Sequence, residues 1–410
     1  MSDQKKSRIS IPQSLTTGQY TTQEQLLEVH KSGEKLFIGI PRENILQENR
    51  IPLVPSVITS LVGVGYRIII ETKAGEKSNF TDQELSEAGA EIVYSKEEVY
   101  QGEIILKVAP PTLEEIEMMR PNQILISPLH LPLLSAEYIQ SLRKKRVIAL
   151  AMEYIQDASG SYPIVRILSE LAGIAAITTA AELLSFSSKG RGVLLGGISG
   201  VPPAKVVILG AGMVAEYATR TALGMGAEVK IFDNNIYKLK RIQDQVGRQL
   251  FTSSINPVYL SEQLKNADVA IGAIHSADAR APIVVTEEMV MNMKPGAVIV
   301  DVSIDQGGCF ETSEITSLDR PTFVKHEVVH YCVPNIASKY PRTSSISMAN
   351  ILTPLLLHAA KNNGIEALLL DDFGLRHGVY TYKGSLTNMY LGKLFDIKCT
   401  DLELLITSRS

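Results

Sequence analysis

Residues 204–215 read Ala-Lys-Val-Val-Ile-Leu-Gly-Ala-Gly-Met-Val-Ala, and they carry the clearest fold signal of the chain. The apolar run Val206–Leu209 is typical of a buried β-strand, and it ends in the pattern Gly210-x-Gly212-x-x-Ala215. Gly210 permits a tight turn, Gly212 lets the backbone approach a pyrophosphate, and Ala215 lets the following helix pack closely on the strand. The pattern therefore predicts a strand, a glycine turn and a helix N-terminus that together bind a dinucleotide.

The residues after the glycine turn favour the same interpretation. A helix-type run, Glu216–Leu223, is followed by a second apolar run, Val229–Phe232, which ends at Asp233. The spacing of Asp233 from the glycines suits a carboxylate on the adenosine ribose hydroxyls, and because such a carboxylate repels a 2′-phosphate, we expect NAD rather than NADP. Lys238 faces either the adenine-ribose edge or solvent. The alternative for the whole stretch is an ordinary β-α-β turn without a ligand.

Length, composition and net charge limit the class of protein to which the chain can belong. The chain has 410 residues, of which 45% are hydrophobic and 20% charged, so it is long enough for two or three domains with substantial cores. A formal net charge of −4 gives no indication of binding to nucleic acid or an anionic membrane. The cysteines at positions 309, 332 and 399 lack metal-type spacing, so we expect reduced thiols in a cytoplasmic protein without a metal site. We expect neither a signal peptide nor a membrane span, since the longest apolar stretches are interrupted.

The chain begins with a polar segment and continues in regular α/β alternation. We predict a loosely held arm over residues 1–34, with one helix near Thr22–Lys31. Strands separated by helices then imply a parallel sheet covered on both faces. The expected strands of this first domain are Leu36–Ile40, Arg67–Glu71, Glu91–Tyr94, Ile104–Val108, Gln123–Ile126 and Val147–Met152, with helices at Ser56–Val64, Thr81–Ala88 and Ala136–Lys144.

Two long runs of small and apolar residues, Ile164–Ser187 and Ile346–Ala360, predict helices that pack closely on a neighbour. A glycine-rich hinge over residues 190–203 separates the first run from the glycine turn. The last stretch, from about residue 371, contains a Lys-Gly turn and is expected to fold back on the first domain. Further strands of the second domain are expected at Val269–Ile274, Ala297–Ser303 and Val328–Cys332.

Three side chains after predicted strands are candidates for chemistry. Asp305 lies where ligands bind in open α/β sheets, and it either acts in catalysis or forms an Asx-type turn. His130, in the segment Ser-Pro-Leu-His, is either a general acid/base or a structural histidine. Arg50 lies in a polar loop after the first strand. Its guanidinium either binds a substrate carboxylate bidentately or forms a surface ion pair with Glu43 or Glu48.

Several segments together resemble one family. Over about Lys35 to the C-terminus, the sequence resembles the alanine dehydrogenase family, which shares its fold with the soluble nucleotide-binding part of nicotinamide nucleotide transhydrogenase. The segments that carry the resemblance are Gly39-Ile-Pro-Arg-Glu43, Ala74-Gly-Glu-Lys-Ser78, Leu129-His-Leu131, Gly190-Arg-Gly-Val-Leu-Leu-Gly-Gly197, Gly200-Val-Pro-Pro-Ala204, Asp301-Val-Ser-Ile-Asp-Gln-Gly-Gly-Cys-Phe-Glu311, Pro334-Asn335 and Pro341-Arg-Thr-Ser344.

The resemblance implies a fold and a domain order. The expected fold is α/β, with two Rossmann-like, doubly wound parallel-sheet domains joined by two long helices. Residues 35–163 would form the first part of the substrate domain, residues 164–341 the NAD-binding domain, and residues 342–410 the second part of the substrate domain. The family commonly forms hexamers, so we expect a homo-oligomer, a hexamer or a dimer, with closure over the substrate as a hinge motion.

The resemblance also implies an activity, which is the reversible oxidative deamination of L-alanine to pyruvate and ammonium with NAD. Arg50 would hold the substrate carboxylate, and Asn335 would line the site between nicotinamide and substrate. His130 and Asp305 would transfer protons. The residues expected to hold NAD are Ser169, Gly210, Gly212, Ala215, Asp233, Lys238, Ile274, Val302, Ser303, Ile304 and Asp305.

The sequence departs from the family pattern at a substrate position. The family has Lys-Val-Lys-Glu-Pro after the strand that ends near Val108, and its second Lys contacts the substrate, whereas here that position is Ala109. Lys107 either partly substitutes or has its own structural role. The loop that begins at Ile274 also differs from the apolar loop of the family. Three hypotheses remain: an alanine dehydrogenase, a dehydrogenase of another amino acid, and an NAD-binding, transhydrogenase-like or regulatory relative without turnover.

Overall fold

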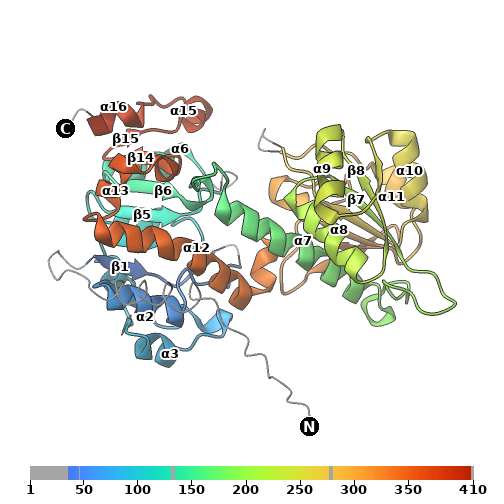
Figure 1. Cartoon of the computed structure of the whole chain (residues 1–410), viewed down its shortest axis with the longest axis horizontal. Helices are drawn as coiled ribbons and strands as arrows, with labels where there is room; N and C mark the ends of the chain where they lie inside the picture. Colours follow the sequence, from blue (N-terminus) through green and yellow to red (C-terminus); the bar gives the residue numbers. More distant parts are fainter. Residues whose placement is uncertain (1–35, 46, 131–133, 277–279, 408–410) are drawn as a thin grey trace, which may run out of the picture. The chain divides into compact units, whose positions relative to one another are not determined.

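The computed structural model describes residues 36–45, 47–130, 134–276 and 280–407. The predicted arm over residues 1–34, with its helix at Thr22–Lys31, lies outside the described residues. Helices alternate with strands along the rest of the chain, and the strands form two sheets, which confirms the predicted α/β fold class (Figure 1).

The first sheet contains the six strands predicted for the first domain, and these six are parallel to one another. Its strand order is β15-β14-β6-β5-β4-β1-β2-β3. The central strands are buried on both faces, which explains why they appear in the sequence as continuous apolar runs. The strands are β1 (Phe37–Ile40), β2 (Arg67–Glu71), β3 (Glu91–Val93), β4 (Ile104–Leu106), β5 (Ile124–Ser127), β6 (Ile148–Ala151), β14 (Val379–Tyr382) and β15 (Ser385–Leu386).

Short helices cover the first sheet, and hydroxyl side chains mark where several of them begin. Thr81 and Thr112 each form a capping box with a glutamate three residues later, and Ser135 accepts a hydrogen bond from the backbone of Tyr138. The three predicted helices of this region are all present. The helices are α2 (Pro55–Gly63), α3 (Asp82–Glu87), α4 (Lys96–Val99), α5 (Leu113–Met118) and α6 (Ala136–Lys144).

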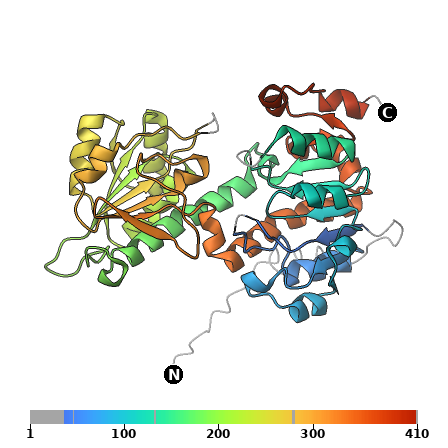
Figure 2. The ribbon, with the colours of Figure 1, turned by 180° about the vertical axis from the view of Figure 1, so that it is seen from behind.

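The C-terminal segment folds back on the first sheet, as predicted. β14 pairs antiparallel with β6, and β15 returns beside β14. Lys383 and Gly384, with φ values of 46° and 96°, form the two-residue turn between them. Figures 1 and 2 both show this red segment on the same part of the molecule as the blue N-terminal strands. The first sheet is therefore parallel in its centre and antiparallel at one edge, and the sequence had not predicted that edge.

The second sheet has the strand order β12-β13-β11-β10-β7-β8-β9, and the predicted strands are all present. β12 is an antiparallel edge strand that was not predicted. The elements are β7 (Lys205–Leu209), α8 (Met213–Gly224), β8 (Glu228–Phe232), α9 (Ile236–Val246), β9 (Phe251–Ser253), α10 (Pro257–Asn266), β10 (Val269–Gly272), α11 (Glu287–Met291), β11 (Val298–Asp301), β12 (Thr322–Lys325) and β13 (Val328–Tyr331).

Two helices of 21 residues each, α7 (Pro163–Leu183) and α12 (Pro341–Lys361), correspond to the two predicted long helices. α7 ends earlier than predicted, because a short 3-10 turn follows it, and α12 begins earlier, because Pro341 starts the helix. α7 packs closely on α8: a Cβ added at Gly173 would lie 2.4 Å from the carbonyl oxygen of Val214. The small residues of α7 therefore serve a tight helix–helix contact.

α7 also corrects the expectation that every apolar stretch falls well short of a membrane span. By length and composition alone this helix qualifies as a candidate span, with a mean hydropathy of 1.6. The sequence-based expectation counted charged residues and glycine as interruptions, although a candidate span tolerates glycine and up to two charged residues. Core helices meet the same criterion, and the contact of α7 with α8 accounts for its composition.

Candidate functional site

The carboxyl ends of β5 and β11 carry two of the predicted catalytic side chains. His130 lies in the loop after β5, and Asp305 lies on η6 (Val302–Gln306), which directly follows β11. The carboxyl ends of parallel strands are where open α/β sheets bind ligands. Each sheet therefore contributes one of the two side chains to a common site.

Arg50 is buried in the loop after β1, and Glu48 of the same loop binds it. Nε donates to Glu48 Oε1 (2.6 Å), and Nη2 donates to Glu48 Oε2 (2.5 Å). Nη2 also donates to Asn335 Oδ1 (2.9 Å). The third nitrogen, Nη1, is buried and has no hydrogen-bond partner among the described residues. Because an unpaired buried charged donor is costly, Nη1 is available to an anionic group that the chain does not supply.

The ion pair expected between Arg50 and Glu48 is present, but it is buried rather than on the surface, with side-chain exposures of 5% and 1%. Arg50 lowers the pKa of Glu48 against the opposing effect of burial, so this carboxylate stays ionised. Glu48 holds two of the three guanidinium nitrogens in a fixed plane. Glu48 therefore orients Arg50 and leaves the Nη1 edge of the guanidinium for a ligand.

Asn335 connects the two sheets at this site. It follows β13 and precedes η7 (Ile336–Lys339), with a left-handed φ of 56°. Its Nδ2 donates to Glu48 Oε2 (2.9 Å), and its backbone N–H donates to Asp305 Oδ1 (2.8 Å). Together with the bond from Arg50 Nη2, these contacts place Asn335 between the arginine of the first sheet and the aspartate of the second.

Asp305 and His130 influence each other across the site. Desolvation by surrounding protein raises the pKa of Asp305, although its side chain is still reached by solvent, and the charges of His130 and Arg50 act in the opposite direction. Burial lowers the pKa of His130, partly offset by Asp305. His130 is therefore neutral near pH 7 and able to accept a proton. It has a left-handed φ of 47°, which is uncommon for a residue other than glycine.

Lys107 does not take the place of the family lysine. Its side chain is 1% exposed, and its Nζ pairs with Glu43 Oε2 (2.9 Å) and Glu115 Oε2 (3.4 Å). Glu43 Oε1 accepts the backbone N–H groups of Val108 (2.6 Å) and Ala109 (3.3 Å). Lys107 thus has the structural role that was one of the two alternatives, and Glu43, the other carboxylate proposed as a partner of Arg50, belongs to this cluster instead.

The glycine turn has the geometry expected for a phosphate-binding site. Gly210 has a φ of 107°, and a Cβ there would lie 2.3 Å from the carbonyl oxygen of Ala273, so only glycine fits. Gly212 is the N-cap of α8, and a Cβ there would meet no atom of the described residues within 4 Å. Ala215 is fully buried against the strand. The space at Gly212 lies at a helix N-terminus, where N–H groups bind anions.

Asp233 ends β8 and contacts the glycine turn directly. Its Oδ2 accepts the backbone N–H of Ala211 (2.7 Å), and its Oδ1 accepts that of Asn235 (2.7 Å). The carboxylate is thereby fixed beside the turn that would hold the pyrophosphate. Lys238, on the first turn of α9, is exposed, and its charge is close enough to lower the pKa of His275 together with burial.

A pocket of about 270 Å³ joins α7 to the strand ends of the second sheet. Six predicted site residues line it: Ser169, Ile274, Val302, Ser303, Asp305 and Asn335. Val214, two residues after Gly212, lines it as well, so the pocket adjoins the glycine turn. Ile304 is buried and does not line this pocket. The other predicted site residues outside the lining are Gly210, Gly212, Ala215, Asp233 and Lys238.

The structure adds residues that the sequence had not assigned to the site. His275 and Gln306 line the pocket. Gln306 joins two loops, because its Oε1 accepts the backbone N–H of Ser276 (2.9 Å) and its Nε2 donates to the carbonyl oxygen of Ser276 (3.0 Å). Glu48 is the third addition. The sequence named Glu48 only as one of two surface ion-pair partners of Arg50, and the structure shows it as the buried partner in the site.

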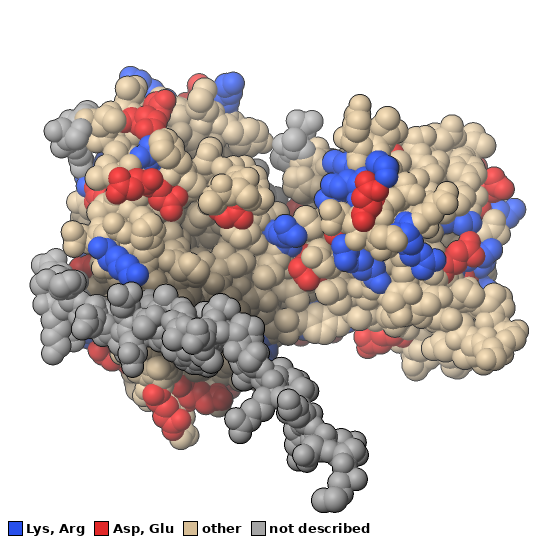
Figure 3. All heavy atoms as spheres, in the orientation of Figure 1, with Lys and Arg blue, Asp and Glu red and all other residues tan. Residues whose placement is uncertain are grey.

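Basic side chains gather on the face of the second sheet's helices, although the net charge of the chain is negative. Figure 3 shows lysine and arginine side chains concentrated over the region of α8 and α9. These helices contribute Arg220, Lys238, Lys240 and Arg241. Arg241 Nη2 also donates to the carbonyl oxygen of Ala211 in the glycine turn (3.1 Å). This local positive charge favours the approach of an anionic ligand to the turn.

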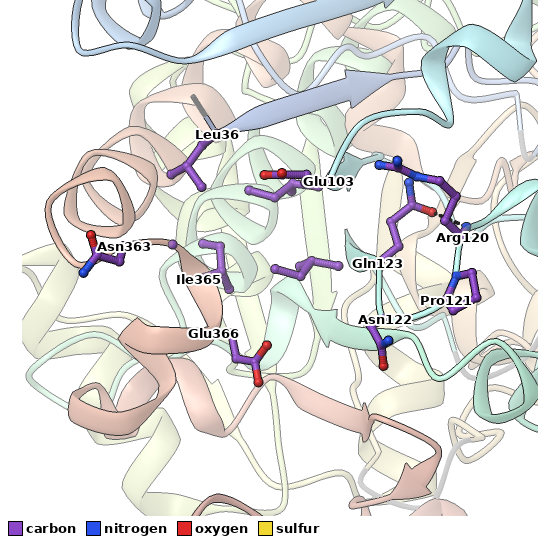
Figure 4. A pocket seen from close by; sticks show the side chains of 12 residues that line it. Leu36, Glu103, Arg120, Pro121, Asn122, Gln123, Asn363, Ile365 and Glu366 are labelled. Carbon is purple, nitrogen blue, oxygen red and sulfur yellow. Dashed lines mark hydrogen bonds between the residues drawn. The ribbon is translucent and has the colours of Figure 1, made fainter. Parts of the chain in front are cut away.

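A larger cavity, of about 570 Å³, lies at the opposite, amino end of β4 and β5 (Figure 4). Leu36, Glu103, Arg120 and Glu366 are among the side chains that surround it. Gln123, also in the lining, is fully engaged in hydrogen bonds to neighbouring backbone groups. None of the predicted site residues lines this cavity, so we assign the functional site to the carboxyl ends of the strands.

Comparison with known proteins agrees with this geometry. Residues 39–175 match the family model for the alanine dehydrogenase/PNT N-terminal domain, and residues 176–389 match the model for the C-terminal domain. Alanine dehydrogenase 2 of Staphylococcus aureus (strain USA300) is 39% identical over 367 residues, which is 89% of this chain and 98% of that protein. Alanine dehydrogenase of Bacillus subtilis (strain 168) is 40% identical over 353 residues, 86% of this chain and 93% of that protein.

Solved structures show the same relationship. An L-alanine dehydrogenase superposes with a TM-score of 0.81 at 36% identity, covering 88% of this chain and 99% of that one. A transhydrogenase from Sinorhizobium meliloti superposes with a TM-score of 0.72 at 24% identity, over 85% of this chain and 98% of that one, and shares the fold. The resemblance predicted from the sequence is confirmed, and the chain belongs to the alanine dehydrogenase/PNT family.

Proposed function

We propose that this chain is an NAD-dependent amino-acid dehydrogenase that interconverts L-alanine with pyruvate and ammonium. One observation carries the proposal: a buried arginine with a nitrogen free for an anion is joined through Asn335 to Asp305, which lines the pocket beside the glycine turn. A carboxylate site and a dinucleotide site are thereby adjacent. The names of the relatives from Staphylococcus aureus and Bacillus subtilis support alanine as the substrate.

Arg50 is the proposed anchor for the substrate carboxylate. Its Nη1 carries N–H groups without an acceptor among the described residues, and Glu48 holds the plane of the guanidinium. Charge-assisted hydrogen bonds to a carboxylate would satisfy this buried edge. A bound α-carboxylate would then lie next to the Asn335 side chain, which accepts from the same guanidinium.

His130 and Asp305 are the proposed acid/base pair. The lowered pKa of His130 keeps the imidazole neutral near pH 7, able to take a proton from the substrate amine or from the water that adds to the imine carbon. Asp305 has a raised pKa, so its carboxylate is a better proton acceptor than an ordinary aspartate. The two groups come from different sheets, and the proposed mechanism has both act at the same substrate carbon.

The residues of the second sheet fit a dinucleotide. The space at Gly212 and the helix N-terminus would take the pyrophosphate, Asp233 the ribose, and the pocket lined by Ser169 and Ile274 the nicotinamide end. NAD supplies a hydride acceptor when it is bound. Val302, Ser303 and Ile304 place Asp305 at this end, since they form one short helix with it.

Ala109 supports a second candidate, a dehydrogenase of another amino acid or an NAD-binding relative without turnover. Ala109 is 2% exposed and hydrogen-bonds to Glu43, whose charge also acts on Arg50, so the end of β4 lies close to the carboxylate site. Lys107 does not replace the family lysine there, because two glutamates bind its Nζ. Ala109→Lys is therefore expected to raise alanine turnover if this position limits it.

The deciding experiment is an NADH-forming assay of the full chain against a panel of L-amino acids. Turnover of alanine above all others supports the alanine proposal, and a preference for a larger side chain supports the second dehydrogenase. Asp305→Asn is the negative control, because NADH formed by a preparation of this variant measures the contribution of contaminating enzymes. Absence of turnover with every amino acid, in a protein that binds NAD by calorimetry, would support the relative without turnover.

We further propose that the protein acts in the cytoplasm as a homo-oligomer, a hexamer or a dimer. The family membership supports this assembly, and the free cysteines in the described part of the chain are compatible with a reducing compartment. Light scattering of the purified protein will give the mass of the assembly. A monomer at micromolar concentration would contradict the proposal.

A further inference from the structure

Glu153 is a partly buried glutamate with a buried carboxylate oxygen, and the proposed mechanism gives it no role. It lies on η4 (Met152–Tyr154), directly after β6. β6 is the parallel neighbour of β5, with Ser127 opposite Ala151. The carboxyl ends of the two strands therefore bring Glu153 to the loop that carries His130.

The contacts of Glu153 are with the backbone of that loop. Its Oε1 accepts the N–H of Leu129 at 2.7 Å, and the backbone N–H groups of Glu153 itself and of His130 also help to lower the pKa of the carboxyl. The preceding residue, Pro128, has no N–H to offer. The carboxylate thus holds the N–H of Leu129 directly before the chain turns into the left-handed conformation of His130. Such a conformation costs free energy and persists only when surrounding groups hold it.

The other carboxylate oxygen, Oε2, is buried and has no hydrogen-bond partner among the described residues. Burial raises the pKa of Glu153 to about 7, against the stabilising effect of the backbone N–H groups. The titratable groups whose environment Glu153 affects are Tyr138 of α6, Tyr154 of η4 and Tyr380 of β14, and burial raises the pKa of each, so all three are neutral near pH 7. The backbone N–H groups are therefore the main support of its negative charge.

We propose that Glu153 is a positioning residue for the His130 ring, which it places by binding the backbone N–H of Leu129, directly before His130. The kinetic consequence of this inference rests on the proposed dehydrogenase function. A displacement of about 1 Å of a reacting group can cost on the order of 10²-fold in rate. Loss of the carboxylate is therefore expected to lower kcat while the contacts to NAD, which lie on the other sheet, are unchanged.

The test compares two substitutions at one position. Glu153→Ala removes both acceptors and is expected to lower kcat by about 10- to 100-fold, with the Kd for NAD and the KM for alanine within a few-fold of wild type. Glu153→Gln keeps a carbonyl oxygen for the Leu129 N–H but lacks the charge, like the protonated glutamate, so its kcat at pH 8 is expected to lie between those of wild type and Glu153→Ala. Glu137→Gln, an exposed glutamate on α6, is the matched control and should behave as wild type.

The pH profile separates positioning from a general structural effect. In wild type, kcat should fall as the pH drops through about 7, because protonation of Glu153 weakens its hold on the Leu129 N–H. In Glu153→Gln this limb is expected to disappear, and the remaining limb belongs to His130, with a midpoint below 6.5. An acid limb at the same pH in Glu153→Gln and wild type would overturn the proposal.

A measurement without turnover keeps the inference distinct from the proposed function. The chain has seven histidines, and the ring resonance of His130 can be assigned by its loss in His130→Asn. In Glu153→Gln and Glu153→Ala this resonance alone is expected to shift. If wild type oxidises no amino acid, the proposed function fails while a shifted His130 resonance still supports the positioning role; an unmoved resonance in both variants overturns it.

Discussion

Arg50→Lys tests the proposed substrate anchor most directly. Arg50 uses Nε and Nη2 for Glu48 and Asn335, and only Nη1 is left for a ligand. A lysine ammonium has to satisfy the same buried glutamate with a single nitrogen, so it cannot also present a separate donor edge to the substrate. The protein should still fold, because the positive charge next to Glu48 is retained.

The magnitude follows from the hydrogen bonds that are lost. Hydrogen bonds to charged groups contribute roughly 1.5–3 kcal/mol, and about 1.4 kcal/mol corresponds to a factor of ten. Arg50→Lys is therefore expected to lower kcat/KM for alanine by about 10- to 100-fold, mostly through KM, with no change in NAD affinity. Initial rates of NADH formation over a range of alanine concentrations measure the effect, and calorimetry with NAD measures the affinity.

The chain offers a matched control. Arg67 forms the same kind of two-point contact with Glu91 (2.9 and 2.8 Å), but that pair is about half exposed. Exposed pairs contribute little, so Arg67→Lys should leave KM and kcat unchanged. If Arg50→Lys is folded and active with the KM of wild type, the guanidinium does not bind the substrate carboxylate, and its free nitrogen has another explanation.

Three further predictions follow from the described contacts. Asp305→Asn and His130→Ala are each expected to remove most turnover, by about 10²- to 10⁴-fold, with the Kd for NAD within a few-fold; wild-type kcat in both would refute the acid/base assignment. Asp233→Ala should weaken NAD binding and relax the preference over NADP, because the fixed carboxylate beside the glycine turn is lost; equal wild-type affinity for the two cofactors by calorimetry would contradict this. Since burial raises the pKa of Glu153 from 4.5 to about 7, the stability contributed by its protonated form is lost as the pH rises through 7. The free energy of unfolding of Glu153→Gln, minus that of wild type, should therefore increase between pH 5 and pH 8, by up to ~3 kcal/mol. If chemical denaturation gives the same difference at both pH values, the pKa of Glu153 is not raised.

Most of the fold could be predicted because its signals are local. A parallel strand buried on both faces is a continuous apolar run, and this is why the strand at residues 67–71 was predicted with the observed bounds. The glycine turn could also be predicted, because glycine is the only residue type that fits at position 210. The φ there is positive, and a Cβ would collide with the carbonyl oxygen of Ala273. The edge strand Thr322–Lys325 was missed because it is short and only partly buried, with no apolar run to mark it.

The sequence by itself determined which residues stand at strand ends, and therefore that Asp305, His130 and Arg50 were candidates. It could not determine their partners, because those contacts join positions far apart in the chain: Arg50 meets Asn335 across 285 residues. Tertiary structure alone decided that Glu48 occupies two nitrogens of Arg50 and leaves the third free, that Lys107 is held by Glu43, and that Glu153 reaches the His130 loop. The physical reason is that burial and pairing set the charge and availability of a polar group, and both depend on which distant segments the fold brings together.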